Sequence, residues 1–320
     1  MKTTVLLTCY NHEKFISKAF ENIIENIDLV DEIVVCDDYS SDESVKQLEE
    51  MLAQVTCKVV RIFNSENRGL NYVWNTALKS ITGDIIICQS CDDMSSSDRI
   101  PYTLKYFKDN PDVEFLVTDY QFVNDVGEYG AIVRRKNKNL NLENLLRKGS
   151  SIPLFGMSFR REFIKILGAL PIHITNEDDF IGFLAVSCSN VALVAECHYI
   201  YRIHDASMSN WVLSFDKKFV LENFIIQQQN RISNFQAIHD KLNSVNYNLS
   251  EFERQLISQR IGLHEKYSGL PELGLYSRLA LLVSCRSVVN YRDLIIIIFG
   301  VRALMIIASL KRMRVRLSSK

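Results

Sequence analysis

Two pairs of neighbouring aspartates are the residues of this chain whose type and position most clearly indicate chemistry. Asp37-Asp38 and Asp92-Asp93 each follow a short apolar segment, at 33–36 and 85–88. Carboxylates gathered in one place repel one another unless a positive charge lies among them. A divalent cation that carries a diphosphate would supply that charge, because such ions bind carboxylate and phosphate oxygens. Helix capping alone does not account for two such pairs.

The elements that must position these aspartates are indicated by two alternating hydrophobic periodicities over the first 125 residues. Short apolar runs are typical of buried strands, and the segments between them have apolar positions at helical spacing. The predicted strands lie at 4–9, 33–36, 59–63, 85–88 and 114–117, and the predicted helices at 15–27, 40–52, 70–78 and 98–108. This alternation predicts an α/β fold with βαβ units and a mostly parallel central sheet covered on both faces.

Polar residues follow the first, second and fourth predicted strands, and ligands in such sheets bind outside the carboxyl ends of the strands. Thr8-Cys9-Tyr10-Asn11 follows the first strand, and the two aspartate pairs follow the other two. Ser40 and Glu43 have the spacing of a capping box, so we expect the second helix to begin at Ser40. Asp98 is expected to cap the fourth helix.

Four segments in this order resemble the family-2 glycosyltransferases, which have the GT-A fold. They are Thr8-Cys9-Tyr10-Asn11, EIVVCDDYSSDES (32–44), NRGLNYVWNTALKSITGD (67–84) and the strand that leads into Ser90-Cys91-Asp92-Asp93. The resemblance extends from about residue 3 to residue 209. It implies an inverting transferase that moves a sugar from a nucleotide-diphosphate sugar to an acceptor hydroxyl. A Rossmann dehydrogenase or a nucleotidyltransferase would need a glycine-rich turn after the first strand, and Thr-Cys-Tyr-Asn stands there instead.

The resemblance implies a role for four residues at the nucleotide. Thr8 and Tyr10 would line the nucleobase pocket, Asp38 would accept a hydrogen bond from a base N–H, and Arg68 would lie near the base or the phosphates. An aromatic ring and a carboxylate suit a flat base that carries an N–H, such as uracil, so a UDP-sugar is the expected donor. Ordinary packing explains Tyr10 alone equally well.

The metal motif of the family is usually Asp-x-Asp-Asp, and here it is Ser90-Cys91-Asp92-Asp93. Asp92 matches the carboxylate that holds the ion, Mg²⁺ or Mn²⁺, whereas Ser90 replaces the first acid. Tyr201-Arg202-Ile203-His204 resembles a later element of the family, in which the histidine completes the metal shell or touches the diphosphate. The alternative for His204 is a polar residue at a strand end. The missing acid leaves a catalytically inactive, sugar-nucleotide-binding relative as the alternative function.

The resemblance also implies a general base. Asn176-Glu177-Asp178 precedes the apolar segment 180–187 and resembles a family motif whose aspartate takes the proton of the acceptor. We therefore expect Asp178 to be the base, with Asp179 as the alternative, and a single displacement needs only one base. Helix capping by the same segment is compatible with this role. Gly156 lies in a segment, 153–157, that resembles a family loop whose small backbone lets the donor sugar approach.

Charge and cysteine usage limit the partners and the compartment. The chain has 37 basic and 38 acidic residues, but five basic and no acidic residues fall in 311–320, so the rest carries 32 against 38. Residues 1–310 therefore carry a net negative charge, which makes them a poor partner for nucleic acid, and none is expected.

Eight cysteines in 320 residues do not form a disulfide scaffold, and no secretory signal opens the chain, so a cytoplasmic location is expected.

The predicted organisation is a GT-A domain at 1–210, a helical region at 211–290 and a tail at 291–320. Within the domain, 1–125 is the nucleotide-binding half and 126–210 the acceptor half, which opens on an exposed insertion at 126–150.

The tail joins the apolar run 294–310, interrupted by Arg302, to the basic end. We expect it to lie on the anionic inner face of the cell membrane, where the acceptor would be a saccharide or lipid-linked saccharide for surface polysaccharide. A helix buried against the body or a second subunit is the alternative.

Overall fold

The computed structural model describes residues 1–124, 127–134, 140–204, 217–268 and 288–289. The chain divides into two compact units. The first consists of 1–137, 154–172 and 188–203, and the second of 138–153, 173–187 and 204–320. The predicted boundaries at 125, 210 and 290 stay predictions.

The first unit is built on one mixed sheet. Its strands are β1 (Thr3–Cys9), β2 (Glu32–Asp37), β3 (Lys58–Phe63), β4 (Ile85–Ser90), β5 (Met94–Ser95), β6 (Phe115–Asn124), β7 (Tyr129–Val133), β8 (Met157–Arg160) and β9 (Val191–Ile203). Their order is β3-β2-β1-β4-β8-β6-β9-β5, and β7 pairs with β6. Strands β3, β2, β1 and β4 are parallel, as predicted, whereas β8 is antiparallel to both of its neighbours. The parallel half is the part that carries the aspartate pairs.

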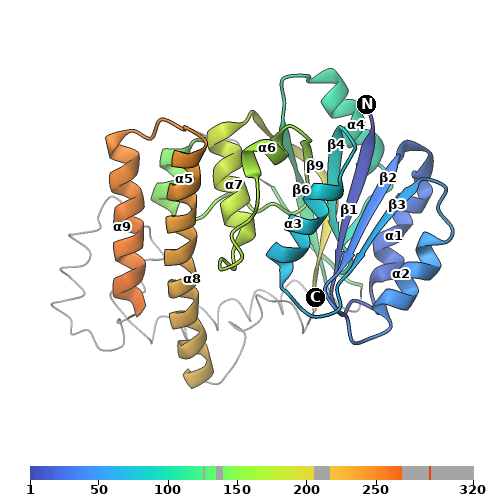
Figure 1. The fold of residues 1–320 in the computed structure, drawn as a ribbon, viewed down its shortest axis with the longest axis horizontal. Coiled ribbons are helices and arrows are strands. Elements are labelled where there is room, and N and C mark those ends of the chain that lie inside the picture. The colour runs from blue at the N-terminus through green and yellow to red at the C-terminus, as the bar shows by residue number, and fades with distance from the viewer. Residues whose placement is uncertain (125–126, 135–139, 205–216, 269–287, 290–320) are drawn as a thin grey trace. The chain divides into compact units, whose positions relative to one another are not determined.

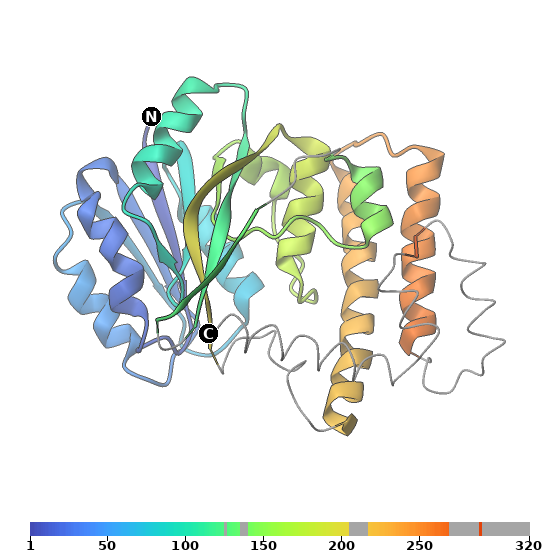
Figure 2. The same ribbon diagram turned by 180° about the vertical axis from the view of Figure 1, so that it is seen from behind.

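Helices cover both faces of this sheet. They are α1 (Ile16–Glu25), the 3₁₀ turn η1 (Ile27–Leu29), α2 (Ser44–Leu52), α3 (Leu70–Ser80), α4 (Arg99–Asp109) and α6 (Phe163–Leu167). Figures 1 and 2 show α1, α2 and α4 on one face and α3 on the other. Successive side chains of a strand point to opposite faces. Val5 and Leu7 of β1 accordingly pack in one fully buried cluster with Phe20 of α1 and Ile100 of α4.

The capping box predicted at Ser40 is wrong. Helix α2 begins at Ser44, and no side-chain hydrogen bond caps it. The Ser40 hydroxyl instead donates to Asp37 and accepts the Asn11 N–H at 2.8 Å. These bonds hold 38–43 as a loop, which competes with an earlier helix start. Asp98 does occupy the N-cap position of α4, but its side chain makes no cap hydrogen bond.

The second unit contains α5 (Leu142–Lys148), α7 (Glu177–Cys188), α8 (Lys217–Ser244) and α9 (Glu251–Ser268). Helices α8 and α9 confirm the helical pattern predicted beyond residue 215. Helix α5 corrects the predicted exposed insertion, because its three leucines are buried. The guanidinium of Arg260, 1% exposed, donates to the carbonyls of Leu146 and Arg147, and Arg231 Nη1 donates to Gly149 O at 2.9 Å. Two cations therefore satisfy the carboxyl end of α5.

The apolar run 294–310 and the basic residues after it lie outside the described residues. Within the described part of the chain, no helix combines the length and the apolar character that a bilayer crossing requires.

Candidate functional site

The candidate site lies at the carboxyl ends of β1, β2 and β4. Strand β1 runs between the other two, with Thr8 opposite Cys36 on one side and opposite Ser90 on the other. The pairing continues past the strand end, where the Cys91 N–H donates to Thr8 O at 2.9 Å. Since parallel strands end at the same edge of a sheet, both aspartate pairs come to that edge, one on each side of β1.

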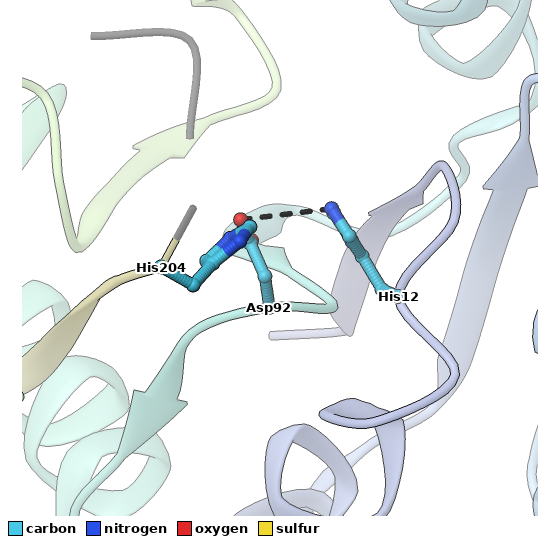
Figure 3. Close-up of side chains that lie close together, drawn as sticks. All are labelled: His12, Asp92 and His204. Carbon is cyan, nitrogen blue, oxygen red and sulfur yellow. Dashed lines mark ion pairs between the residues drawn. The ribbon is translucent and has the colours of Figure 1, made fainter. Parts of the chain in front are cut away.

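Asp92 faces a histidine that the sequence analysis did not select. Its Oδ2 lies 3.6 Å from Nε2 of His12, and its Oδ1 accepts a hydrogen bond from the Ser90 hydroxyl. One ligand atom each from His12, Asp92 and His204 lie within 4.8 Å of one another, as Figure 3 shows. Two imidazoles and a carboxylate can hold a first-row divalent cation, and this donor set fits Mn²⁺ better than Mg²⁺.

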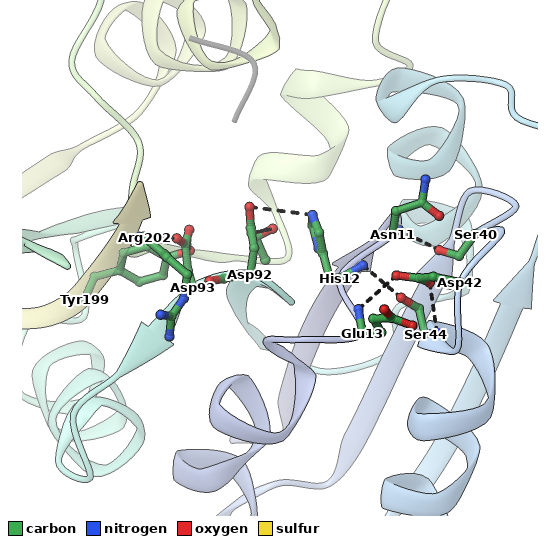
Figure 4. Close-up of polar contacts among 11 residues, drawn as sticks. Asn11, His12, Glu13, Ser40, Asp42, Ser44, Asp92, Asp93, Tyr199 and Arg202 are labelled. Atoms are coloured by element: carbon green, nitrogen blue, oxygen red, sulfur yellow. Dashed lines mark hydrogen bonds and ion pairs between the residues drawn. The ribbon is translucent and has the colours of Figure 1, made fainter. Parts of the chain in front are cut away.

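Asp93 has different partners from the adjacent Asp92. It is 3% exposed, and its carboxylate accepts the Tyr199 hydroxyl at 2.7 Å and the Arg202 N–H at 2.8 Å. Arg202 also donates from Nε to the Asp92 carbonyl at 3.0 Å (Figure 4). Burial, together with the charge of Asp92, raises the pKa of Asp93 to about 8. These bonds fasten the end of β9 to the loop after β4, and His204 directly follows that strand.

The loop that carries His12 is held by hydrogen bonds to residues after β2 and at the start of α2. The Asn11 N–H donates to Ser40 Oγ and the His12 N–H to Ser44 Oγ, both at 2.8 Å (Figure 4). Asn11 has φ 56°, a left-handed conformation that asparagine tolerates. Burial lowers the pKa of His12, but the hydrogen bond with the Cys9 side chain and the charge of Asp92 outweigh it, so that the pKa is raised. In the sequence, the only indication of a role for His12 is its position directly after the Thr8–Asn11 turn.

The residues predicted at the nucleotide lie around the same edge. Asp38 is buried, and its carboxylate accepts the Arg68 N–H at 2.9 Å, the Gly69 N–H at 2.7 Å and the Asn64 side chain at 2.9 Å. A carboxylate has about four acceptor positions, so a base N–H can still bind. Thr8 is half-buried at the end of β1, and Tyr10 is 45% exposed.

The guanidinium of Arg68 is exposed and already has protein partners. It donates from Nε to Glu66 at 2.9 Å and from Nη1 to the Tyr72 hydroxyl at 2.8 Å. It also lies 4.7 Å from the centre of the Tyr72 ring. A phosphate would therefore compete with Glu66 for this cation.

Gly156 has a structural reason to be glycine. Its φ is +73°, and a Cβ there would lie 2.8 Å from Tyr199 Cβ and 2.9 Å from Thr118 Oγ1. The backbone thus passes too close to β6 and β9 for any side chain. The predicted approach of a donor sugar to this residue stays a prediction.

The second unit holds the carboxylates at the start of α7. Asp179 Oδ1 accepts the Ser151 N–H at 2.7 Å, and the Ser151 hydroxyl lies 3.2 Å from the Asp178 carbonyl. Asn234 Nδ2 donates to the Asn176 carbonyl at 3.3 Å. The Asp179 carboxylate therefore has a structural role, and both Asp178 and Asp179 are half-buried. Burial, together with the neighbouring Asp178, raises the pKa of Glu177 to about 8.

The sequence matches the family described as Glycosyl transferase family 2 over residues 4–167, just over half of the chain. Among curated relatives, the Escherichia coli protein UDP-Glc:alpha-D-GlcNAc-diphosphoundecaprenol beta-1,3-glucosyltransferase WfgD is 22% identical over 210 residues, which make up 65% of this chain and 79% of that one. The chain spans only 21%, 47% and 66% of the length of three other curated relatives that it matches.

Two solved structures have the same fold. Staphylococcus aureus TarS 1–349 in complex with UDP-GlcNAc has a TM-score of 0.63 at 15% identity, over 96% of this chain and 89% of that one. A mannosyltransferase from Pyrobaculum calidifontis in complex with GDP-Man and Mn²⁺ has a TM-score of 0.50 at 16% identity, over 92% and 87%. At these identities the likeness shows the fold alone, which is of the GT-A type.

Proposed function

Because this chain belongs to glycosyl transferase family 2, we propose that it is an inverting glycosyltransferase, which moves a sugar from a nucleotide-diphosphate sugar to an acceptor hydroxyl. The observation that carries the proposal is the cluster of His12, Asp92 and His204 at the carboxyl ends of β1 and β4. That edge is where sheets of this kind bind ligands. A divalent cation among these side chains would offset much of the negative charge of Asp92 and a bound diphosphate.

The donor is assigned to the carboxyl edge of the sheet. Thr8 and Tyr10 line the base, Asp38 accepts a base N–H, and Arg68 lies near the base or the phosphates. Asp92 and His204 are the proposed ligands of Mg²⁺ or Mn²⁺, which when bound supplies Lewis-acid charge to the leaving diphosphate. The free acceptor position of Asp38 and the exposed ring of Tyr10 support a flat base with an N–H, and UDP is the proposed nucleotide.

The acceptor is activated by Asp178. Its carboxylate takes the hydroxyl proton as the acceptor oxygen attacks the anomeric carbon, and the bond to the diphosphate breaks on the opposite face of the sugar. The bond from Ser151 to Asp179 supports this assignment, because it gives Asp179 another task. The loop around Gly156 is proposed to lie beside the donor sugar.

The proposed acceptor is a saccharide or a lipid-linked saccharide in surface polysaccharide assembly. The name of the Escherichia coli relative, which includes a diphosphoundecaprenol acceptor, supports this class. The proposed location is the cytoplasm, on the inner face of the cell membrane. The basic tail supports it, because Lys and Arg side chains bind anionic headgroups.

A donor screen tests the proposal. Full-length protein is incubated with UDP-glucose, UDP-GlcNAc and GDP-mannose, each with Mn²⁺ or Mg²⁺, and release of the nucleoside diphosphate is measured. We expect one UDP-sugar to be cleaved faster than the others. With a saccharide acceptor, nuclear magnetic resonance should show a β-linked product from an α-linked donor. An α-linked product would contradict the single displacement, and no turnover of any sugar nucleotide would contradict the transferase.

A further inference from the structure

We infer that His12 is a ligand of the divalent cation and takes the place of the carboxylate that is missing at Ser90. The ion would then be held by two imidazoles and one carboxylate, and Mn²⁺ would be preferred to Mg²⁺. The inference rests on the proposed function, because it concerns the ion that Asp92 holds in it.

The separation of His12 and Asp92 fits two ligands of one ion better than a direct contact. Nε2 and Oδ2 are 3.6 Å apart, which is too long for a charge-assisted hydrogen bond. Two ligand atoms that each lie about 2.1–2.2 Å from an ion are about 3.0–3.6 Å apart at angles from octahedral to tetrahedral. The two side chains point toward each other across the gap in Figure 3. An ion between them would bind both.

Ser90 supports this assignment by what its hydroxyl does. It donates to Asp92 Oδ1, so it orients the carboxylate, while Oδ2 faces His12. A hydroxyl that donates to a carboxylate orients that carboxylate and does not itself replace the missing acid. The ligand that the missing acid would have supplied then comes from the loop after β1 instead of from the loop after β4.

The loop that carries His12 is held in place through its backbone. The His12 N–H donates to Ser44 Oγ and the Asn11 N–H donates to Ser40 Oγ, both at 2.8 Å. A fixed backbone limits the positions that the imidazole can take, as a metal ligand requires. Imidazole nitrogen binds Mn²⁺ readily, whereas Mg²⁺ prefers oxygen ligands and retains its water.

Electron paramagnetic resonance of Mn²⁺ added to the full chain tests the inference without relying on turnover. Coordinated imidazole gives ¹⁴N modulation in the spin echo of bound Mn²⁺, and loss of the free-ion signal gives the affinity. We expect His12→Ala to weaken Mn²⁺ binding at least about 10-fold and to reduce the ¹⁴N modulation. His198→Ala is the matched control, because His198 bonds to Ser96 and packs on Tyr102 in the same unit. It should change neither quantity.

The outcomes separate the two proposals. His12→Asn serves as a second variant, since it keeps a polar side chain but has no imidazole nitrogen, and its folding is checked by thermal unfolding. If folded His12→Asn keeps wild-type affinity and ¹⁴N modulation while Asp92→Ala loses Mn²⁺, the inference is overturned and the proposed function stands. If the wild type binds no Mn²⁺ and still cleaves a sugar nucleotide in excess chelator, the metal role itself fails, and the inference with it.

Discussion

Neighbouring carboxylates in this chain have different partners and therefore different roles. Asp92 faces His12, whereas Asp93 is buried and binds Tyr199 and Arg202. Asp179 likewise accepts the Ser151 N–H, and the adjacent Asp178 is the proposed base. In the sequence, only the family resemblance distinguishes the members of each pair, because the partners lie far away along the chain. The sequence analysis missed His12 for the same reason: its proximity to Asp92 comes only from the pairing of β1 with β4.

The pair Asp178 and Asp179 gives a matched test of the base. Asparagine at 178 keeps the shape of the side chain but cannot take a proton, so Asp178→Asn should lower the turnover number by at least roughly 10²-fold. Asp179→Asn retains an oxygen for the Ser151 N–H and should cost far less. Steady-state kinetics with a fixed acceptor measures both, and donor affinity should barely change. A large loss in Asp179→Asn alone would assign the base to Asp179.

Gly156 gives a test of backbone strain. Alanine there would combine a φ of +73° with close contacts to Thr118 and Tyr199, so Gly156→Ala should destabilise the fold by about 2–4 kcal/mol. Gly127→Ala is the control, because its φ is also positive, at +88°, but no atom lies within 4 Å of the added Cβ. It should cost only about 1–2 kcal/mol. Urea unfolding compares the two, and equal losses would show that crowding at 156 is unimportant.

The strands and helices were largely predictable because their hydrophobic periodicities are local. The strands β1 to β4 and the helices between them follow the sequence pattern within a few residues. The start of α2 was mispredicted, since the Ser40 hydroxyl binds Asn11, 29 residues away, instead of capping the helix. The antiparallel insertion of β8 between β4 and β6 has no local signal either, because four residues of strand do not reveal their direction.

Glu32, at the start of β2, anchors neighbouring elements and gives a test by pH. It is 2% exposed and binds Lys58 at 2.6 Å, Thr4 at 2.8 Å and the Thr82 N–H at 2.9 Å. Burial raises its pKa, but these bonds outweigh burial and lower the pKa to about 2. The charged form therefore stabilises the fold above about pH 4.5, and the stabilisation is lost as the pH falls through about 2.

Glu32→Gln should accordingly lose on the order of 2 kcal/mol of unfolding free energy at pH 7. The difference from wild type should shrink as the pH is lowered from about 5 toward 2. Glu49→Gln is the control, since its ion pair with Arg61 is exposed and such pairs contribute little. Chemical unfolding at several pH values measures both variants. A pH-independent difference for Glu32→Gln would contradict the stated role of its charge.

On the scale of the whole molecule, the proposed function draws on both units. Of the residues proposed to bind the donor, all but His204 lie in the first unit, whereas His204 and the proposed base Asp178 fall in the second. Sequence patterns placed both aspartate pairs at the carboxyl edge of the sheet, as in the structure, because each pair follows a strand that pairs with β1. They were less informative for the second unit, where α5 buries its leucines within a segment that looks polar. The acceptor specificity depends on residues with no motif, so it could not be predicted.

The tail provides a prediction for the whole chain. The apolar run 294–310 is interrupted by Arg302 and followed by five basic residues, each of which adds roughly 1 kcal/mol on an anionic surface. Full-length protein should float with anionic liposomes at low salt, and a chain truncated after Asn290 should not. Full-length protein with neutral liposomes is the control. If the truncated chain floats as well as the full chain, the tail is not the anchor.

The central claim is that Asp92 holds a cation that the transfer requires. The most direct measurement is nucleoside diphosphate release from the preferred sugar nucleotide, before and after excess chelator and after Mn²⁺ is added back. We predict that the chelator abolishes release, that Mn²⁺ restores it more fully than Mg²⁺, and that Asp92→Ala is inactive under all three conditions although it unfolds at the wild-type temperature. An unchanged rate in excess chelator, or an active Asp92→Ala, would contradict the claim.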